Sequence, residues 1–151
     1  MAWFDMTFPE DLLDGLLNTE AEDIMIAAIE NAAPILEESM KRSARAAIMH
    51  EGESEMVESI KASKTRRTKD GSAIICTVGP TGTSKHTYNR VGKAKTKQTE
   101  KVSNALKAIW KEYGIAGKQA PSPFITNATE NAEAGVIDAM QKTVRQKVGE
   151  K

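Results

Sequence analysis

A helical repeat of apolar residues that follows Thr19 constrains the fold of this chain more than any other feature of its sequence. Thr19-Glu-Ala-Glu22 has the form of a capping box, in which a Thr hydroxyl and a Glu carboxylate bond the free backbone N–H groups at a helix start. Apolar residues then recur at spacings of three and four, which predicts an amphipathic helix of about thirty residues. Pro34 predicts a kink near Glu30 or a restart capped by Asn31.

Two further helices are predicted in the second half of the chain. The first spans residues 102–113, with Val102, Leu106, Ile109 and Trp110 on one stripe and Tyr113 beside it. Gly114 is expected to end that helix. The second begins at Thr126 or Asn127 and continues to the basic C-terminal tail.

An antiparallel strand pair is predicted between these helical regions. Residues 72–78 are rich in β-branched side chains, and Asp70-Gly71 is a hairpin signal because it favours a type I′ turn. We therefore expect residues 59–68 to pair with residues 72–78. The expected fold class is α+β, an antiparallel β-sheet packed by a long N-terminal helix and a C-terminal helix, with a long basic loop.

The loop between the last two predicted helices is rich in turn-forming residues, and its residues together with the aromatic residues beside it are called the structural hub. Gly114 stops one helix, and Pro123 fixes the backbone just before Phe124 begins the approach to the next. Trp110, Tyr113 and Phe124 are expected to anchor the last helix to the core. The hub residues are Trp110, Tyr113, Gly114, Pro121, Pro123 and Phe124.

The composition predicts one domain over residues 1–151 with a thin core. Only 5% of the residues are aromatic, so Ile, Leu, Val, Met and Ala must supply the burial. Such a chain often completes its burial against copies of itself. Residues 1–18 form a predicted N-terminal arm whose Trp3, Phe4, Met6 and Phe8 either fold back on the core or dock on a neighbouring subunit.

Charge is distributed unevenly although the chain is neutral as a whole. Residues 1–60 hold 14 acidic and 3 basic residues, and residues 61–101 hold 11 basic and 2 acidic residues. This asymmetry suits self-association between unlike faces, or a charged partner; two solvated faces that happen to differ would also explain it. The interface candidates are Lys85, Arg90, Lys93, Lys95 and Lys97 in a flexible basic loop at 83–101, and Glu30, Glu37 and Glu38 on the acidic helix.

Residue types that carry catalysis are sparse. Cys76, the single cysteine, lies in a predicted strand without a nearby base, and His50 and His86 are interpreted as solvated residues. Gly79-Pro-Thr-Gly82 lacks the Gly-Lys-Ser/Thr ending of a phosphate-binding loop. We therefore expect no enzyme activity, cofactor or metal. No signal peptide or membrane span is evident, so the chain is expected to be soluble and cytosolic when made.

The basic segment also leaves open a nucleic-acid-binding module. Its lysines could neutralise phosphates, although only Tyr88 and His86 are present to stack on bases.

Several short motifs occur in an order that resembles a known family. They are Gly52 followed by Met56-Val-Glu-Ser-Ile60, then Val78-Gly79-Pro80, Glu112-Tyr-Gly114, and Pro121-Ser-Pro-Phe124 followed by Ala128. Over residues 20–147 this order resembles the neck and tail-component family of long-tailed bacteriophages. Met56 stands where that family usually has Leu, Ile115 where it usually has Thr, and the segment 83–101 is longer than expected.

The resemblance implies a structural virion protein without an active site. Such a protein would form a ring, expected to be hexameric, that joins the tail tube to the head connector, completes the tail or terminates it. The implied partners are copies of itself and the connector, stopper and tail-tube proteins, with DNA in the lumen as a further contact. The implied location is the neck or tail of the virion, after assembly in the host cytoplasm.

Overall fold

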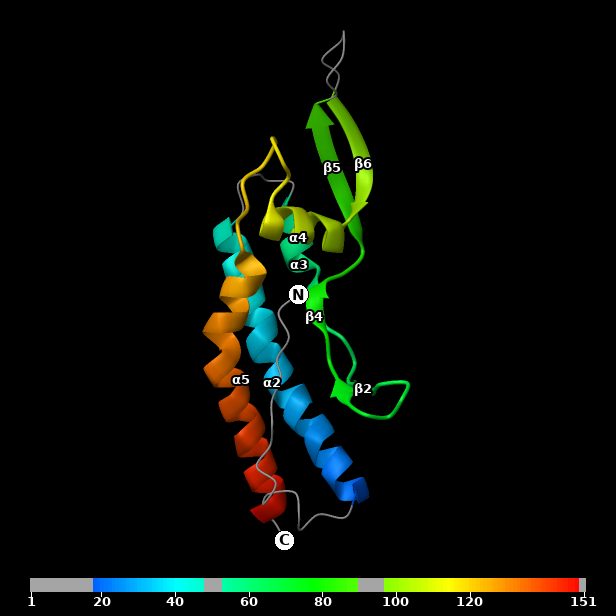
Figure 1. Ribbon diagram of the computed structural model, residues 1–151, viewed down its shortest axis with the longest axis vertical. Coiled ribbons are helices and arrows are strands. Elements are labelled where there is room, and N and C mark those ends of the chain that lie inside the picture. The colour runs from blue at the N-terminus through cyan, green and yellow to red at the C-terminus, as the bar shows by residue number, and fades with distance from the viewer. Residues whose placement is uncertain (1–17, 48–52, 90–96, 150–151) are drawn as a thin grey trace.

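The computed structural model describes residues 18–47, 53–89 and 97–149 (Figure 1). Its four helices in this part of the chain are α2 (Asn18–Ala47), α3 (Ser54–Glu58), α4 (Asn104–Tyr113) and α5 (Phe124–Gly149). The strands are β1 (Ile60–Ala62), β2 (Arg66–Arg67), β3 (Ile74–Ile75), β4 (Val78–Pro80), β5 (Thr83–Asn89) and β6 (Lys97–Ser103). The predicted α+β class is confirmed. The predicted arm at 1–18 lies almost entirely outside the described residues.

Helices α2 and α5 pack side by side and run in opposite directions (Figure 1). Ile24 and Ala28 meet Val144 near one end, while Ala32 meets Ala132 and Val136 farther along. Small side chains let the two helices approach closely, as the composition predicted for a thin core. Both long helices were therefore predicted correctly, although α5 begins two or three residues earlier than expected.

Helix α2 continues without interruption through Pro34, so the predicted restart capped by Asn31 is wrong. The Asn31 side chain instead donates a hydrogen bond to Thr143 Oγ1 on α5, across 3.2 Å. Glu22, a member of the predicted capping box, accepts a hydrogen bond from Arg67 next to the ribbon turn.

The first two strand pairs form one irregular antiparallel ribbon that lies against α2. Strand β1 pairs with β4, with Ile60 opposite Pro80, and β2 pairs with β3, with Arg66 opposite Ile75. Between the pairs, residues 63–65 oppose residues 76–77, so the register shifts by one residue as at a β-bulge. The predicted pairing is confirmed.

The turn of this ribbon differs in detail from the prediction. Gly71 N–H donates to the Thr68 carbonyl, which places Lys69 and Asp70 at the centre of the turn. Only Gly71 has a positive φ here, whereas a type I′ turn requires positive φ at both central residues. Hydrogen bonds from Thr68 and Ser72 to the carboxylate lower the pKa of Asp70 to about 2.

Strands β5 and β6 correct the prediction of a flexible loop at residues 83–101. They pair in seven antiparallel positions, from Thr83 opposite Ser103 to Asn89 opposite Lys97, and extend away from the helices above α4 (Figure 1). The Thr87 and Thr99 hydroxyls lie 3.1 Å apart across the pair. Threonine favours strands, but neither face of the hairpin is apolar, so hydrophobic alternation did not reveal it.

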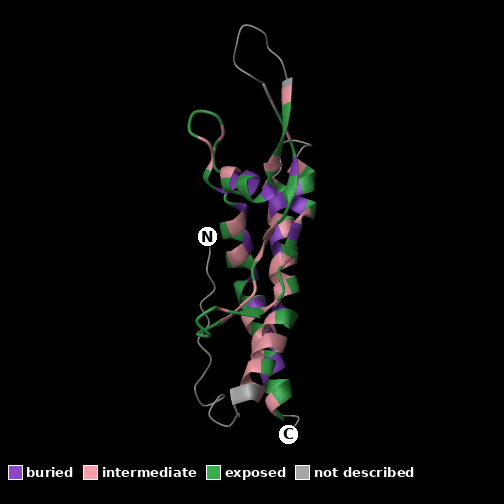
Figure 2. Ribbon diagram, turned by 90° about the vertical axis from the view of Figure 1, so that its right-hand side faces the viewer, coloured by how far each residue is buried: buried purple, intermediate pink, exposed green. Residues whose placement is uncertain are grey.

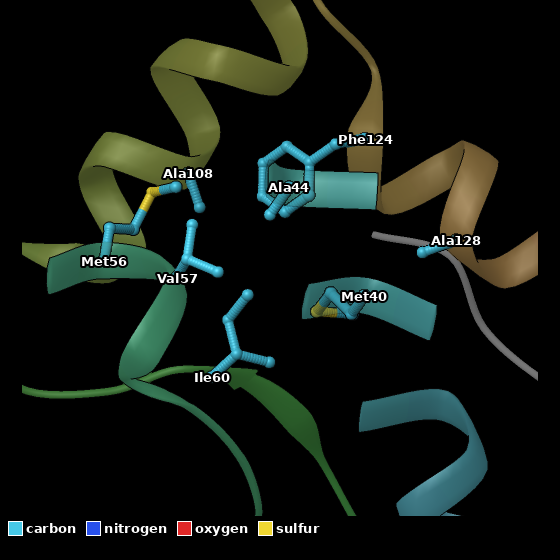
Figure 3. Packing of buried hydrophobic residues seen from close by; sticks show 8 residues of the cluster. All are labelled: Met40, Ala44, Met56, Val57, Ile60, Ala108, Phe124 and Ala128. Atoms are coloured by element: carbon cyan, nitrogen blue, oxygen red, sulfur yellow. The ribbon is translucent and has the colours of Figure 1, made fainter. Parts of the chain in front are cut away.

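The main core cluster lies where α2, α3, α4 and α5 converge (Figure 3). It joins Met40 and Ala44 of α2 to residues of α3, β1, α4 and α5; these are Met56, Val57, Ile60, Ala108, Phe124 and Ala128. Purple segments in Figure 2 mark this buried zone, below the green β5–β6 hairpin. The cluster fixes the position of α4, which carries the unusual surface described next.

Candidate functional site

Helix α4 buries its charged side chains and exposes large apolar ones, which is the reverse of an ordinary surface helix. All three of its charged residues, Lys107, Lys111 and Glu112, are buried together with Asn104 and Ala108. These positions themselves recur at helical spacing and form one inward stripe. Buried charges require partners, and the structure supplies one for each.

The first inward group joins α4 to the hairpin. Asn104 accepts a hydrogen bond from Ser84 Oγ at 2.5 Å and donates to the Thr81 carbonyl at 2.8 Å. Lys107 Nζ donates to Ser84 Oγ and to the Lys85 carbonyl, each at 2.6 Å. Burial lowers the pKa of Lys107, while Glu55 and Glu53 oppose that effect.

A serine beside a lysine of lowered pKa is also a pattern that some enzymes use for nucleophilic catalysis. Here Ser84 and Lys107 are only 6% and 7% exposed, and the Ser84 proton is donated to Asn104. The hydroxyl is therefore not presented to a substrate. The pair instead fastens the base of the hairpin to α4.

The second inward group joins α4 to α3 and α5. Lys111 Nζ lies 2.9 Å from a carboxylate oxygen of Glu53, next to α3. Glu112 accepts hydrogen bonds from Ile125 N–H at 2.7 Å, from Thr126 N–H at 3.1 Å and from the Thr126 hydroxyl at 2.5 Å. A carboxylate at the positive end of a helix satisfies free N–H groups and complements the helix dipole.

The outward stripe of α4 is apolar. Leu106, Ile109 and Tyr113 are 41%, 50% and 65% exposed, and they are all of the large apolar side chains classed as exposed in the described part of the chain. The prediction that Tyr113 anchors the core is therefore wrong. Apolar spacing located the helix correctly, but the inward side is taken by polar side chains with fixed partners.

Other residues of the hub have varied positions. Phe124 is 1% exposed and confirms its predicted role as a core anchor. Gly114 ends α4 as predicted, with φ of 76°.

Trp110 is half-buried, and the centroid of its ring lies 5.5 Å from that of His86 in β5. His86 therefore contacts α4 rather than lying alone in a solvated loop. Pro121 and Pro123 are exposed, and Pro123 directly precedes α5.

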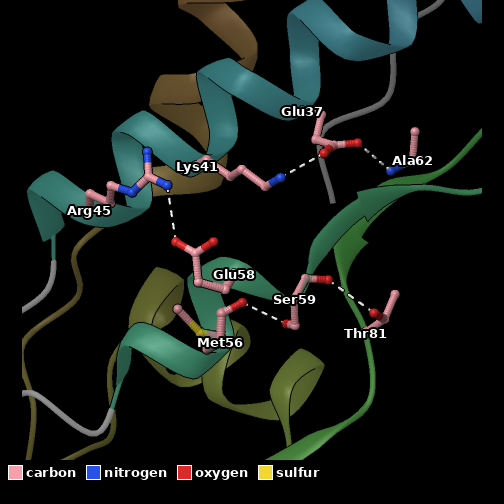
Figure 4. A network of polar contacts seen from close by, with 8 residues as sticks. All are labelled: Glu37, Lys41, Arg45, Met56, Glu58, Ser59, Ala62 and Thr81. Carbon is pink, nitrogen blue, oxygen red and sulfur yellow. Dashed lines mark hydrogen bonds and ion pairs between the residues drawn. The ribbon is translucent and has the colours of Figure 1, made fainter.

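The acidic interface candidates on α2 are partly occupied within the chain. Glu37 accepts hydrogen bonds from Lys41 Nζ at 2.7 Å and from Ala62 N–H at 2.9 Å, which fastens β1 to α2 (Figure 4). The hydrogen bond from Lys41 is the largest cause that lowers the pKa of Glu37, and the hydrogen bond from the Ala62 N–H lowers it further. Glu38 forms an exposed pair with Arg42 at 3.4 Å, and Glu30 is exposed.

The basic interface candidates are only partly placed by the structure. Lys85 is exposed on β5 and lies directly opposite Lys101 on β6. Lys97 is the first residue of β6 and pairs with Asn89. Arg90, Lys93 and Lys95 lie outside the described residues, as does His50.

Two features are absent from residues 18–47, 53–89 and 97–149. These ranges contain no group of three or more His, Cys, Asp or Glu side chains placed to hold a metal ion. None of their helices is long and apolar enough to cross a bilayer. Cys76 is half-buried, and its thiol donates to the Ser63 carbonyl at 3.2 Å.

The polar inward stripe of α4 is the feature that sequence reasoning missed. Its signal was present, since Asn104, Lys107, Ala108, Lys111 and Glu112 have helical spacing, but burial is ordinarily assigned to the apolar stripe. Comparison with protein-family models, curated proteins and solved structures finds no match to this chain.

Proposed function

We propose that this chain is a structural virion protein that forms a ring of six subunits in the neck of a long-tailed bacteriophage. The ring joins the tail tube to the head connector or terminates the tail. The observation that carries the proposal is the inversion of α4, which buries all of its charges and presents Leu106, Ile109 and Tyr113 outward. A monomer gains nothing from exposing such a stripe, whereas an assembling subunit covers it.

The motifs that resemble the phage family also hold framework positions. Met56 and Ile60 are buried in the main core cluster, and Gly79 lies in β4 opposite Lys61 of β1. Glu112 caps α5, and Phe124 is buried at its start. These roles suit a protein whose function depends on shape and on contacts with other subunits.

The proposal is tested first by assembly of the purified full chain. Analytical ultracentrifugation and negative-stain images are expected to show a closed ring. Phage particles made without the protein are expected to have tails that do not join heads or that have abnormal length. Tails of normal length that still join heads would refute the assignment.

A nucleic-acid-binding module is the second candidate, because Lys85 and Lys101 lie directly opposite each other on the hairpin. Like charges in that position repel unless an anion neutralises them. This candidate predicts that the chain is retained on duplex DNA at low salt and released as salt rises. The double variant Lys85→Glu, Lys101→Glu should lose that binding. Absence of binding even at low salt would exclude it.

A further inference from the structure

The outward stripe of α4 exposes large apolar side chains that an apolar partner could cover. Leu106, Ile109 and Tyr113 follow the spacing i, i+3 and i+7, so they form a single ridge. Ala105 is also exposed, and α4 exposes no charged residue. A ridge of this kind matches recognition of an amphipathic helix by its apolar face.

The ridge continues into a shallow hollow beyond the end of α4. The hollow has a volume of about 580 Å³ and is lined by Tyr113 and the following loop, including Ile115, Lys118 and Pro121. Lys118 is the one charged residue of that lining. The ridge and the hollow together therefore combine exposed apolar side chains, the polar Gln119 and the positive charge of Lys118 at one end, which favours an apolar partner that carries acidic residues.

We propose that the N-terminal segment of a second copy of this chain, centred on Leu12–Leu17, docks on this surface. This inference rests on the ring proposed above and names the contact between its neighbouring subunits. Residues 1–17 contain four acidic residues and no basic residue. They also contain eight large apolar residues after Met1: Trp3, Phe4, Met6, Phe8, Leu12, Leu13, Leu16 and Leu17.

The four leucines have helical spacing, and the acids lie between and before them. Leu12, Leu13, Leu16 and Leu17 recur at i, i+1, i+4 and i+5, which places them on one face of a helix. Glu10, Asp11 and Asp14 can then approach Lys118 while the leucines cover the ridge of α4. Apolar and charged complementarity thus point to the same partner segment.

Geometry assigns this contact to a second copy rather than to the same chain. Helix α4 packs through Ala108 against Ala44, which lies 26 residues along α2 from Asn18. At 1.5 Å per residue that separation is about 39 Å. Leu12 precedes Asn18 by six residues, which reach only about 20 Å when fully extended. The leucines of one chain therefore cannot reach its own α4, but they can reach a neighbour's.

Photo-crosslinking of the full chain tests the contact directly. The change Ile109→p-benzoylphenylalanine places a crosslinker on the ridge, and assembly from equal amounts of ¹⁴N and ¹⁵N chains separates contacts within and between copies. Peptides from residues 10–17 are expected to crosslink in mixed-isotope pairs. The same crosslinker at Glu133, exposed on α5, is the matched control and should not capture them. Crosslinks confined to one chain, or to other segments, would overturn the proposal.

Charge substitutions give a second, independent measurement. Ile109→Glu, and separately Leu16→Glu, should each raise the concentration at which the ring forms by at least about tenfold. Because Ile109 is exposed, its substitution should leave the thermal unfolding midpoint of the subunit unchanged. Ala134→Glu, at an exposed position of α5, should assemble as the unmodified chain does.

The outcomes separate this inference from the proposed function. An Ile109→Glu chain that still forms rings at the original concentration would overturn the docking proposal and leave the ring intact. An unmodified chain that stays monomeric at high concentration would overturn both.

Discussion

The carboxylate of Glu112 accepts two hydrogen bonds from Thr126, one from its backbone N–H and one from its hydroxyl. The last turn of α4 thereby caps the first turn of α5, although the two residues belong to different helices. The same carboxylate accepts the Ile125 N–H, so one side chain satisfies several donors at that helix start. Because Glu112 is only 5% exposed, water cannot easily replace it.

Glu112→Ala should therefore destabilise the fold. The change leaves the Ile125 and Thr126 N–H groups without their acceptor near the core, at an expected cost of about 2 kcal/mol in the free energy of unfolding. Urea denaturation followed by circular dichroism measures this difference. The exposed Glu133→Ala on α5 is the control and should change stability by less than about 0.5 kcal/mol. Equal effects of the two variants would contradict the capping role.

Gly114→Ala should be more damaging still. Gly114 has φ of 76° and ψ of −179°, a conformation that is essentially restricted to glycine. An added Cβ would lie 2.6 Å from the Gln119 carbonyl oxygen and 2.8 Å from the Pro121 nitrogen, which are backbone atoms. We expect a loss of about 3 kcal/mol or more, measured by urea denaturation.

Gly117 offers a matched comparison in the same loop. It also has positive φ, but an added Cβ would meet nothing within 4 Å. Gly117→Ala should cost only about 1 kcal/mol. If Gly114→Ala were no worse than Gly117→Ala, close backbone approach would not be the reason for glycine at position 114.

The Lys111–Glu53 ion pair should couple more strongly than an exposed pair. The Lys111 side chain is 5% exposed and that of Glu53 is 21% exposed. A double-mutant cycle with Lys111→Met and Glu53→Gln is expected to give a coupling of about 1–2 kcal/mol. The Arg42–Glu38 pair, with both side chains more than 75% exposed, should give less than about 0.5 kcal/mol in the same cycle. Similar couplings would show that burial does not strengthen the inner pair.

Glu37 should make stability depend on pH in the acidic range. Its pKa is lowered from 4.5 in the fold, so the folded state holds this proton less tightly than the unfolded state does. Its contribution is therefore fully present above about pH 4.5 and is lost as pH falls through the folded pKa. Glu37→Gln should flatten the decline of the unfolding midpoint in this range. An unchanged profile would contradict the role of the Lys41 and Ala62 hydrogen bonds.

Sequence patterns were most informative where one face of an element is apolar and lies on the core. The repeat after Thr19 predicted α2, and β-branched residues around Ile74 predicted the ribbon that lies against it. Phe124 was also assigned correctly to the core. In α2 the period of the apolar residues and their burial coincide, because that helix meets the core on its apolar face.

Apolar periodicity gave wrong predictions where the buried side chains of an element are polar, or where an element has no apolar face. Strands β5 and β6 have no apolar face, so their alternation of Ser, Lys, His and Thr resembled a loop. In α4 Tyr113 was assigned to the core, yet the partners of Lys107 and Glu112 lie 22 and 14 residues away in sequence and could not be foreseen. Long-range hydrogen bonds decide which face of that helix is inside.

The double attachment of α4 has a mechanical consequence. Its first turns hold the base of the β5–β6 hairpin through Ser84, and its last turn holds the start of α5 through Glu112. A displacement of the projecting hairpin is therefore expected to act on the start of α5 through the ten residues of α4.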